Sequence, residues 1–192
     1  SGQAAFSAGD YLESGMDFMR AASGDQSYAL RARLMAGRSF SNSGDLEEAK
    51  EQYRAIVKSS PSSSEAVEAL YELAGILSLD GHLREATQIY DELKSNYPNA
   101  TLTEDSSFRK AELLLELGDF GQARKAFADY RSDYPLGQFR DAALYWGGVA
   151  SNRSNEPLRA LLLWELLIKE FLEAKLYLPN LKICTLFCLK KN

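Results

Sequence analysis

The residue types that most often carry chemistry are scarce in this chain. His82 is the only histidine among 192 residues, so one chain cannot form a histidine-based triad or a metal site with several imidazoles. Cys184 and Cys188 are the only cysteines, and two thiolates fall short of the four ligands of a structural zinc site. Their spacing suits one face of a helix, where the Cβ vectors are poorly aimed for a disulfide. We expect inert buried thiols, and a surface turn position for His82.

Carboxylates recur at helical spacing, but such pairs are more often solvated helix faces than acid–base pairs. The clearest examples are Glu112 with Glu116 and Asp10 with Glu13. The chain has neither a glycine-rich phosphate loop nor a nucleophile elbow. We therefore expect a protein that is not an enzyme, with no cofactor and no metal site.

The charge balance argues against one broad class of partner. The chain has 22 lysines and arginines against 27 acidic residues, a formal net charge of −5 and a pI near 5.1. Nucleic-acid binders normally carry a basic face that displaces counterions, so we expect no nucleic-acid partner. No apolar run reaches roughly 18 residues, so we expect no transmembrane segment. The first residues show neither an initiator Met nor a signal-peptide core, which predicts a trimmed chain.

The elements that would position these side chains repeat every 37 residues, beginning at Gly44, Gly81 and Gly118. A fixed period of this length indicates a repeat architecture. Each copy has an alanine five residues after the glycine, an aromatic nine residues after it and a proline seventeen residues after it: Ala49, Ala86 and Ala123; Tyr53, Tyr90 and Phe127; Pro61, Pro98 and Pro135. We expect the alanine where the two helices of a pair cross, because a larger side chain would not fit there.

Each copy is typical of two amphipathic helices joined by a turn. Apolar spacing over 28–40, 66–79 and 108–117 predicts the first helix of three pairs. A single pair cannot bury its apolar face, so pairs must stack into an all-α solenoid of about four to five repeats. The predicted units are a truncated first repeat at 1–24, complete repeats at 27–61, 62–98, 99–135 and 136–172, and a capping or interaction helix at 173–192.

Shorter signals support this division. Helix caps are predicted at Asp45 with Glu48, Thr101 with Glu104, Asp119 with Gln122 and the serines at 62–64. In the last repeat Ala160 and Trp164 take the alanine and aromatic positions, Asn155 replaces the turn glycine and Pro157 starts a helix. Gly147 and Gly148 fall where we expect neighbouring helices to cross most closely.

The repeated pattern Gly/Ala-x6-Gly-[Asp/His]-x3-Ala-x3-[Tyr/Phe], closed by Pro, resembles the tetratricopeptide repeat over about residues 27–171. The period is longer than the usual ~34 residues. With the endings at 96–99 and 133–136, it resembles bacterial cell-envelope members: the TolA-binding, cell-division-coordinating periplasmic protein and the outer-membrane-assembly lipoproteins. The resemblance implies a right-handed α–α superhelix that binds proteins, in the periplasm or as a membrane-associated lipoprotein. A cytoplasmic location stays open.

In tetratricopeptide arrays the first helix of each pair lines a concave groove through five positions. The resemblance assigns them here to Arg31, Leu34, Arg38, Ser41 and Asn42; Glu68, Tyr71, Gly75, Ser78 and Leu79; Asp105, Phe108, Glu112, Leu115 and Glu116; and Ala142, Tyr145, Val149, Asn152 and Arg153. The main candidates for partner contacts are Arg31, Leu34, Arg38, Glu68, Tyr71, Phe108, Glu112, Tyr145, Val149 and Arg153. Because Tyr, Phe and Arg are common interface anchors, we expect a peptide or helix in this groove.

Two other interpretations stay open. The tail at 173–192 is rich in apolar residues, and with the truncated first repeat it would suit a self-associating structural module. The array would equally suit the docking arm of a larger protein.

Overall fold

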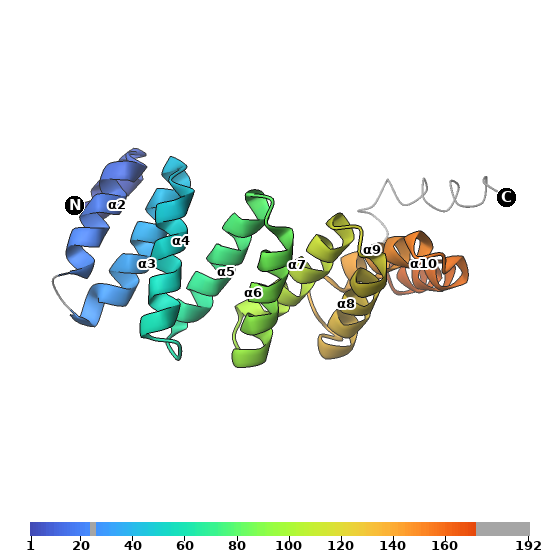
Figure 1. Ribbon diagram of the computed structural model, residues 1–192. Coiled ribbons are helices and arrows are strands. Elements are labelled where there is room, and N and C mark those ends of the chain that lie inside the picture. Colours follow the sequence, from blue (N-terminus) through green and yellow to red (C-terminus); the bar gives the residue numbers. More distant parts are fainter. Residues whose placement is uncertain (24–25, 172–192) are drawn as a thin grey trace.

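The computed structural model describes residues 1–23 and 26–171, which form ten helices and no strand (Figure 1). The helices are α1 (Gly2–Ala8), α2 (Tyr11–Ala22), α3 (Gln26–Ser43), α4 (Leu46–Ser59), α5 (Ser64–Leu79), α6 (Leu83–Asn96), α7 (Leu102–Glu116), α8 (Phe120–Asp133), α9 (Arg140–Arg153) and α10 (Pro157–Phe171). Each helix packs mainly on the helices before and after it in the chain. The predicted fold, an α–α solenoid of four to five helix pairs, is confirmed.

The first helices of the pairs (α3, α5, α7 and α9) are called A helices here, and the second helices (α4, α6, α8 and α10) are called B helices. Successive A helices contact one another. Within the described ranges, successive B helices pack on each other less extensively than successive A helices do. The stack therefore curves toward the A helices, which line its inner face, and the B helices form the outer face.

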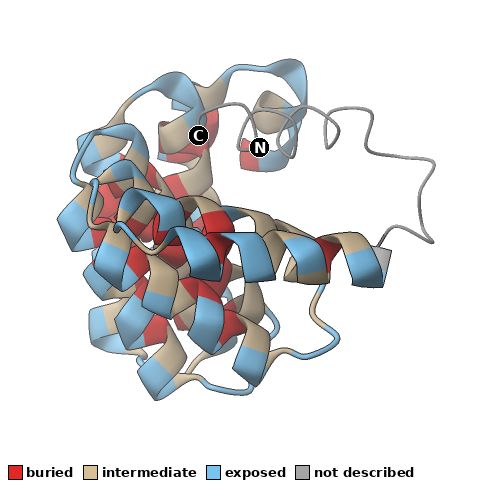
Figure 2. Ribbon diagram, turned by 90° about the vertical axis from the view of Figure 1, so that its right-hand side faces the viewer, coloured by how far each residue is buried: buried red, intermediate tan, exposed pale blue. Residues whose placement is uncertain are grey.

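The repeated small residues lie at the helix crossings, as predicted. Ala49, Ala86, Ala123 and Ala160 are at most 1% exposed. At the last crossing a Cβ on Gly148 would lie 2.3 Å from Trp164 Nε1, so the absence of a side chain admits the indole. Buried residues collect between the helices, whereas exposed residues cover the outside (Figure 2). Small residues at crossings thus fix the register of the stack.

The turns between the two helices of each pair also follow the prediction. Gly9, Gly44, Gly81 and Gly118 have φ between 75° and 92°, in the left-handed region that glycine enters without a Cβ clash. Asn155 takes the same place with φ 63°, the one non-glycine residue with positive φ in the described ranges. Asparagine tolerates this conformation better than most residues.

The predicted caps are only partly correct. The Asp119 carboxylate accepts from the Gln122 backbone N–H, and Ser63 caps α5. Asp45 stands at an N-cap but makes no cap hydrogen bond, because its carboxylate accepts from Ser43 Oγ at 2.5 Å instead. Thr101 stands at the N-cap of α7 as predicted but makes no cap hydrogen bond, and Glu104 is engaged with the loop after α8.

The A helix of the fourth unit begins at Leu102, earlier than the apolar spacing predicted. Its first turns contain the polar residues Thr103, Ser106 and Ser107, which are nevertheless buried. The two serine hydroxyls donate to backbone carbonyls four residues earlier, at 2.6 and 2.8 Å. Hydroxyls that are satisfied within the helix let a polar stretch enter the core, and apolar periodicity cannot detect this.

The capping or interaction helix predicted at 173–192 lies outside the described residues, as do Cys184 and Cys188. Within the described ranges, no helix combines the length and apolar character needed to cross a bilayer.

Candidate functional site: the groove of the A helices

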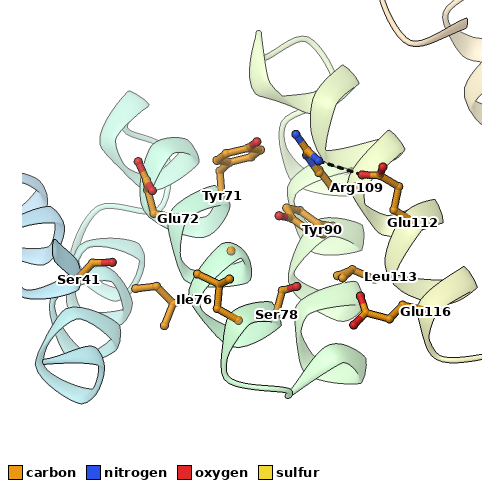
Figure 3. Close-up of a pocket in the computed structure, with 12 residues that line it drawn as sticks. Ser41, Tyr71, Glu72, Ile76, Ser78, Tyr90, Arg109, Glu112, Leu113 and Glu116 are labelled. Carbon is orange, nitrogen blue, oxygen red and sulfur yellow. Dashed lines mark hydrogen bonds and ion pairs between the residues drawn. The ribbon is translucent and has the colours of Figure 1, made fainter. Parts of the chain in front are cut away.

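A groove of about 570 Å³ crosses the inner face of the stack from α3 over α5 to α7 (Figure 3). Its lining comes from three successive repeats: Ser41, Tyr71, Glu72, Gly75, Ile76, Ser78, Leu79, Tyr90, Arg109, Glu112, Leu113 and Glu116. Only Tyr90 belongs to a B helix. The groove therefore depends on the stacking of the repeats.

The groove has an apolar floor and a charged rim. Ile76, Tyr90 and Leu113 are buried by the packing of α5, α6 and α7. Leu79, at the end of α5, is 85% exposed. Tyr71 extends the floor and lies 6.0 Å from the ring centre of Tyr90. A floor of this kind suits an apolar side chain of a bound segment.

Ion pairs link the A helices beside the groove. Arg38 on α3 contacts Glu68 and Glu72 on α5, each at 2.9 Å. Arg31 adds a second contact to Glu68 at 3.2 Å. These contacts join side chains of successive repeats and hold α3 and α5 in register, and we call them the A-helix ladder.

The ladder continues from α5 to α7 through one aromatic residue. The Tyr71 hydroxyl donates to Asp105, and Arg109 lies 3.6 Å from the same carboxylate. Arg109 also donates to Glu112 at 3.0 Å (Figure 3). Glu116 makes no ion pair within residues 1–23 and 26–171, so the groove keeps a net negative rim.

Burial shifts the ionisation of two groove residues. Burial, followed by the hydrogen bond to the Asp105 carboxylate, raises the pKa of Tyr71 to about 12. Burial also raises the pKa of Glu112 above its usual value, although Arg109 acts in the opposite direction. Tyr71 is therefore a neutral donor at physiological pH.

The structure brings only part of the predicted set to the groove. Tyr71 and Glu112 line it, together with the lesser candidates Ser41, Gly75, Ser78, Leu79 and Glu116. Arg31, Arg38 and Glu68 belong to the A-helix ladder. These three lie beside the groove and are tied to each other.

Two predicted contacts are wrong. Leu34 is fully buried in the core around Tyr53, and Phe108 is only 4% exposed. Phe108 stacks on Phe139 at 4.7 Å and meets the edges of Phe127 and Tyr130. In the third repeat the same register position is Tyr71, whose hydroxyl reaches the surface. Leu34 and Phe108 have no polar end and turn fully inward.

The three candidates on α9 do not join the groove. Arg153 lies 6.0 Å from the Phe120 ring, at the α8 end of the repeat. Tyr145 packs edge-on against Trp146, and its carbonyl accepts from Trp164 Nε1. Val149 is half-buried on the same helix. The groove ends at α7, and this part of α9 serves the last helix pair.

Sequence reasoning missed five lining residues: Glu72, Ile76, Tyr90, Arg109 and Leu113. Four of them form two pairs at equivalent positions of successive repeats, Glu72 with Arg109 and Ile76 with Leu113. Both pairs can be found by comparing the repeats. One position is aliphatic in both copies (Ile76 and Leu113), and the other changes from Glu72 to Arg109. Tyr90 lies on a B helix, and the groove prediction covered only the first helix of each pair.

Comparison with known proteins agrees with this architecture. The family model described as "Tetratricopeptide repeat-like domain" matches residues 3–141. The chain belongs to this family. No curated protein matches the chain.

Several solved structures share the fold of this tetratricopeptide repeat-like protein at low sequence identity. A crystal structure of MamA protein is 16% identical with a TM-score of 0.70, covering 92% of this chain and 91% of that one. Repeats of a putative kinesin light chain from Podosopora anserina are 13% identical with a TM-score of 0.69, covering 91% and 93%. A tetratricopeptide repeat protein from Parabacteroides merdae is 21% identical with a TM-score of 0.69, covering 85% and 59%. These likenesses show the fold alone.

Proposed function

We propose that this protein is a non-catalytic scaffold that binds a segment of another protein, as a helix or an extended peptide, in the groove of the A helices. The observation that carries this proposal is a groove of about 570 Å³ that crosses three repeats and combines an apolar floor with a charged rim. An apolar pocket with a few polar groups is the usual form of a binding site.

The charges of the groove favour a partner segment with basic and apolar side chains. Three carboxylates line it against one guanidinium. Arg38 contacts Glu72 and Arg109 contacts Glu112, whereas Glu116 is free of ion pairs within the described residues. A Lys or Arg near Glu116 and a Leu or Phe against Ile76 and Leu113 would match the surface. Complementary rim charges mainly set partner choice and association rate.

For its location we propose a bacterial cell-envelope complex, in the periplasm or on a membrane-anchored lipoprotein. The support is the 37-residue period with its Tyr-Pro repeat endings, which resemble envelope members of the family. Fractionation of cells that produce the full reading frame tests this, and an exclusively cytosolic signal would contradict it.

A defined probe tests the groove. We expect a fluorescent amphipathic helix made of Lys and Leu to bind more tightly than the matching Glu and Leu helix. Glu116→Lys should weaken the Lys/Leu complex about two- to fivefold, the range of one exposed ion pair. The matched control is Glu51→Lys, an exposed residue on α4 on the outer face. Equal loss with both substitutions would show that net charge, and not the groove, governs binding.

A photo-crosslinking residue at Leu79 provides a second test that needs no known ligand. Leu79 projects at the groove end with 85% exposure, and Arg84 is an exposed control position on α6. We expect adducts with a partner protein from position 79, competed by the Lys/Leu helix, and none from position 84. Adducts of equal yield from both positions would overturn the groove as the site.

A further inference from the structure

The outer face of the stack has three valleys between successive B helices, and side-chain ion pairs bridge the first two. In the α4–α6 valley Arg54 contacts Glu85 at 3.2 Å. In the α6–α8 valley Lys94 contacts Asp133 at 2.5 Å, and Lys110 reaches from α7 to Asp91 at 2.5 Å. Each of these ion pairs joins side chains of two successive repeats.

The α8–α10 valley lacks the same bridges. One 37-residue repeat further on, Ala128 takes the position of Asp91 and Gly147 takes the position of Lys110, so neither position can form an ion pair. A cavity of about 260 Å³ remains there. We call this cavity the outer pocket. Its walls are Arg124, Phe127, Ala128, Arg131, Ala143, Gly147, Arg159, Leu162, Leu163 and Leu166.

Arg131 has also lost its carboxylate. One 37-residue repeat after Lys94 and Asp133, the equivalent positions are Arg131 and Glu170. Glu170, however, accepts two hydrogen bonds from Arg140, both at 2.9 Å. Arg131 makes no ion pair within the described residues, and its buried Nε has no hydrogen-bond partner there. A partly buried guanidinium without a partner raises the free energy of the folded state, and a bound anion would lower it.

The other two arginines of the outer pocket each have a carboxylate partner, although the buried Arg124 Nε, like that of Arg131, has no hydrogen-bond partner within the described residues. Arg124 lies 3.3 Å and Arg159 3.0 Å from the same residue, Glu156. Two cations thus share one carboxylate at the rim. Burial lowers the pKa of Arg131 below its ordinary value, and the neighbouring Arg140 cation lowers it further. The pocket is a positive spot on a chain with a net charge of −5.

The surface around the outer pocket is unusually apolar for an outer face. Leu158 is 77% exposed and Leu162 is 65% exposed. On α8 the equivalent positions are Gly121 and Lys125, and α6 has Arg84 and Gln88 there. These positions point outward on every B helix, so stacking a further repeat would not cover them. Exposed leucines beside a lined cavity are typical of a binding surface.

We infer that the outer pocket is a second protein-binding site, which takes a carboxylate of a partner protein together with an adjacent aliphatic or aromatic side chain. The carboxylate would form charge-assisted hydrogen bonds with Arg131. The apolar side chain would rest on Phe127, Leu162 and Leu166. This preference is opposite in sign to that of the groove of the A helices, and it belongs to the opposite face. One chain could therefore hold two chemically different partners.

Nuclear magnetic resonance of the arginine Nε–Hε groups tests the inference directly. The probe is 3-phenylpropanoate, with 3-phenylpropanamide as the uncharged control. We expect the carboxylate to shift the Arg131 Nε resonance with saturation, and the amide to bind about tenfold more weakly. Arg131→Gln should lower carboxylate affinity to that of the amide, Arg131→Lys should restore part of it, and the exposed Arg84→Gln control should change nothing.

A second variant keeps the test sharp if Arg131 also matters for folding. Ala128→Asp restores the acid found in the second valley and should pair with Arg131, abolishing probe binding while the helix content stays unchanged. Equal binding of acid and amide, or an unmoved Arg131 signal, would overturn the inference. A rise in probe affinity on Glu173→Gln would also overturn it, since the chain's own tail would then be the occupant. We expect each of these substitutions to leave binding of the Lys/Leu helix to the groove unchanged. A failure of this inference is therefore distinct from a failure of the proposed function.

Discussion

The two faces of the stack share one register but use their charged side chains differently. On the inner face Arg38 of α3 pairs with Glu68 and Glu72 of α5, and Tyr71 of α5 donates to Asp105 of α7. On the outer face the third valley keeps the Arg124–Glu156 pair but lacks the equivalents of the second valley's ion pairs, and Arg131 has no carboxylate partner within the described residues. The backbone repeat continues through both regions, because it depends on buried small residues. Polar links are free to change from repeat to repeat, and the proposed outer pocket lies where links of the preceding repeat are missing.

The largest expected effect comes from breaking the register that both faces share. Ala123→Leu should overpack the crossing of α8 and cost about 1–3 kcal/mol of unfolding free energy. Ala123 is fully buried there. The matched control is Ala128→Leu on the same helix, where Ala128 is exposed and the cost should stay within about 0.5 kcal/mol. Urea denaturation measures the unfolding free energy of both variants. Equal midpoints would show that Ala123 does not lie at a tight helix crossing.

A smaller difference in stability should distinguish the ion pairs of the inner face from those of the outer face. Arg38→Gln leaves Glu68 and Glu72 without their shared cation, and we expect a loss of about 1 kcal/mol. Arg131→Gln removes a cation that has no carboxylate partner within the described residues, so stability should stay the same or rise slightly. Urea midpoints at low salt measure the contrast. An equal loss for both substitutions would mean that Arg131 is paired in solution.

The helix stack could be predicted from the sequence because the residues that determine it recur at fixed positions in each repeat. The alanines at 49, 86, 123 and 160 and the turn residues need only the 37-residue period to be recognised, and the structure has them as expected. The missing Asp91 and Lys110 equivalents could likewise be found by comparing repeats. The burial of Leu34 could not, because Tyr71 at the same position reaches the surface.

The ion pairs lay beyond sequence reasoning for a different reason. Glu170 has two arginines within electrostatic reach, and it pairs with Arg140 at the start of α9 in preference to its register partner Arg131. The choice depends on how α9 and α10 are angled in space. Long side chains can reach several partners, so spacing along the chain cannot decide between them.

The smallest expected effect tests the Tyr71 link of the A-helix ladder. Burial and the Asp105 carboxylate raise the pKa of Tyr71 to about 12, against about 10 in an unfolded chain. The neutral hydroxyl therefore contributes stability that is fully present below pH 10 and is lost as the pH rises through about 12. At neutral pH, Tyr71→Phe should cost about 0.5 kcal/mol, the value of one modest hydrogen bond.

A carbon NMR titration of the Tyr71 ring measures this link without a change in fold. Asp105→Asn keeps an acceptor oxygen but removes the negative charge, so the pKa of Tyr71 should fall toward 10 while burial alone keeps it above that value. Glu65→Gln, at the N-terminal end of the same α5, serves as the charge-matched control and should leave the titration in place. If Asp105→Asn left the Tyr71 midpoint unmoved, the hydroxyl would not donate to Asp105. The ladder would then end at α5, and the two faces would resemble each other in having an incomplete set of links.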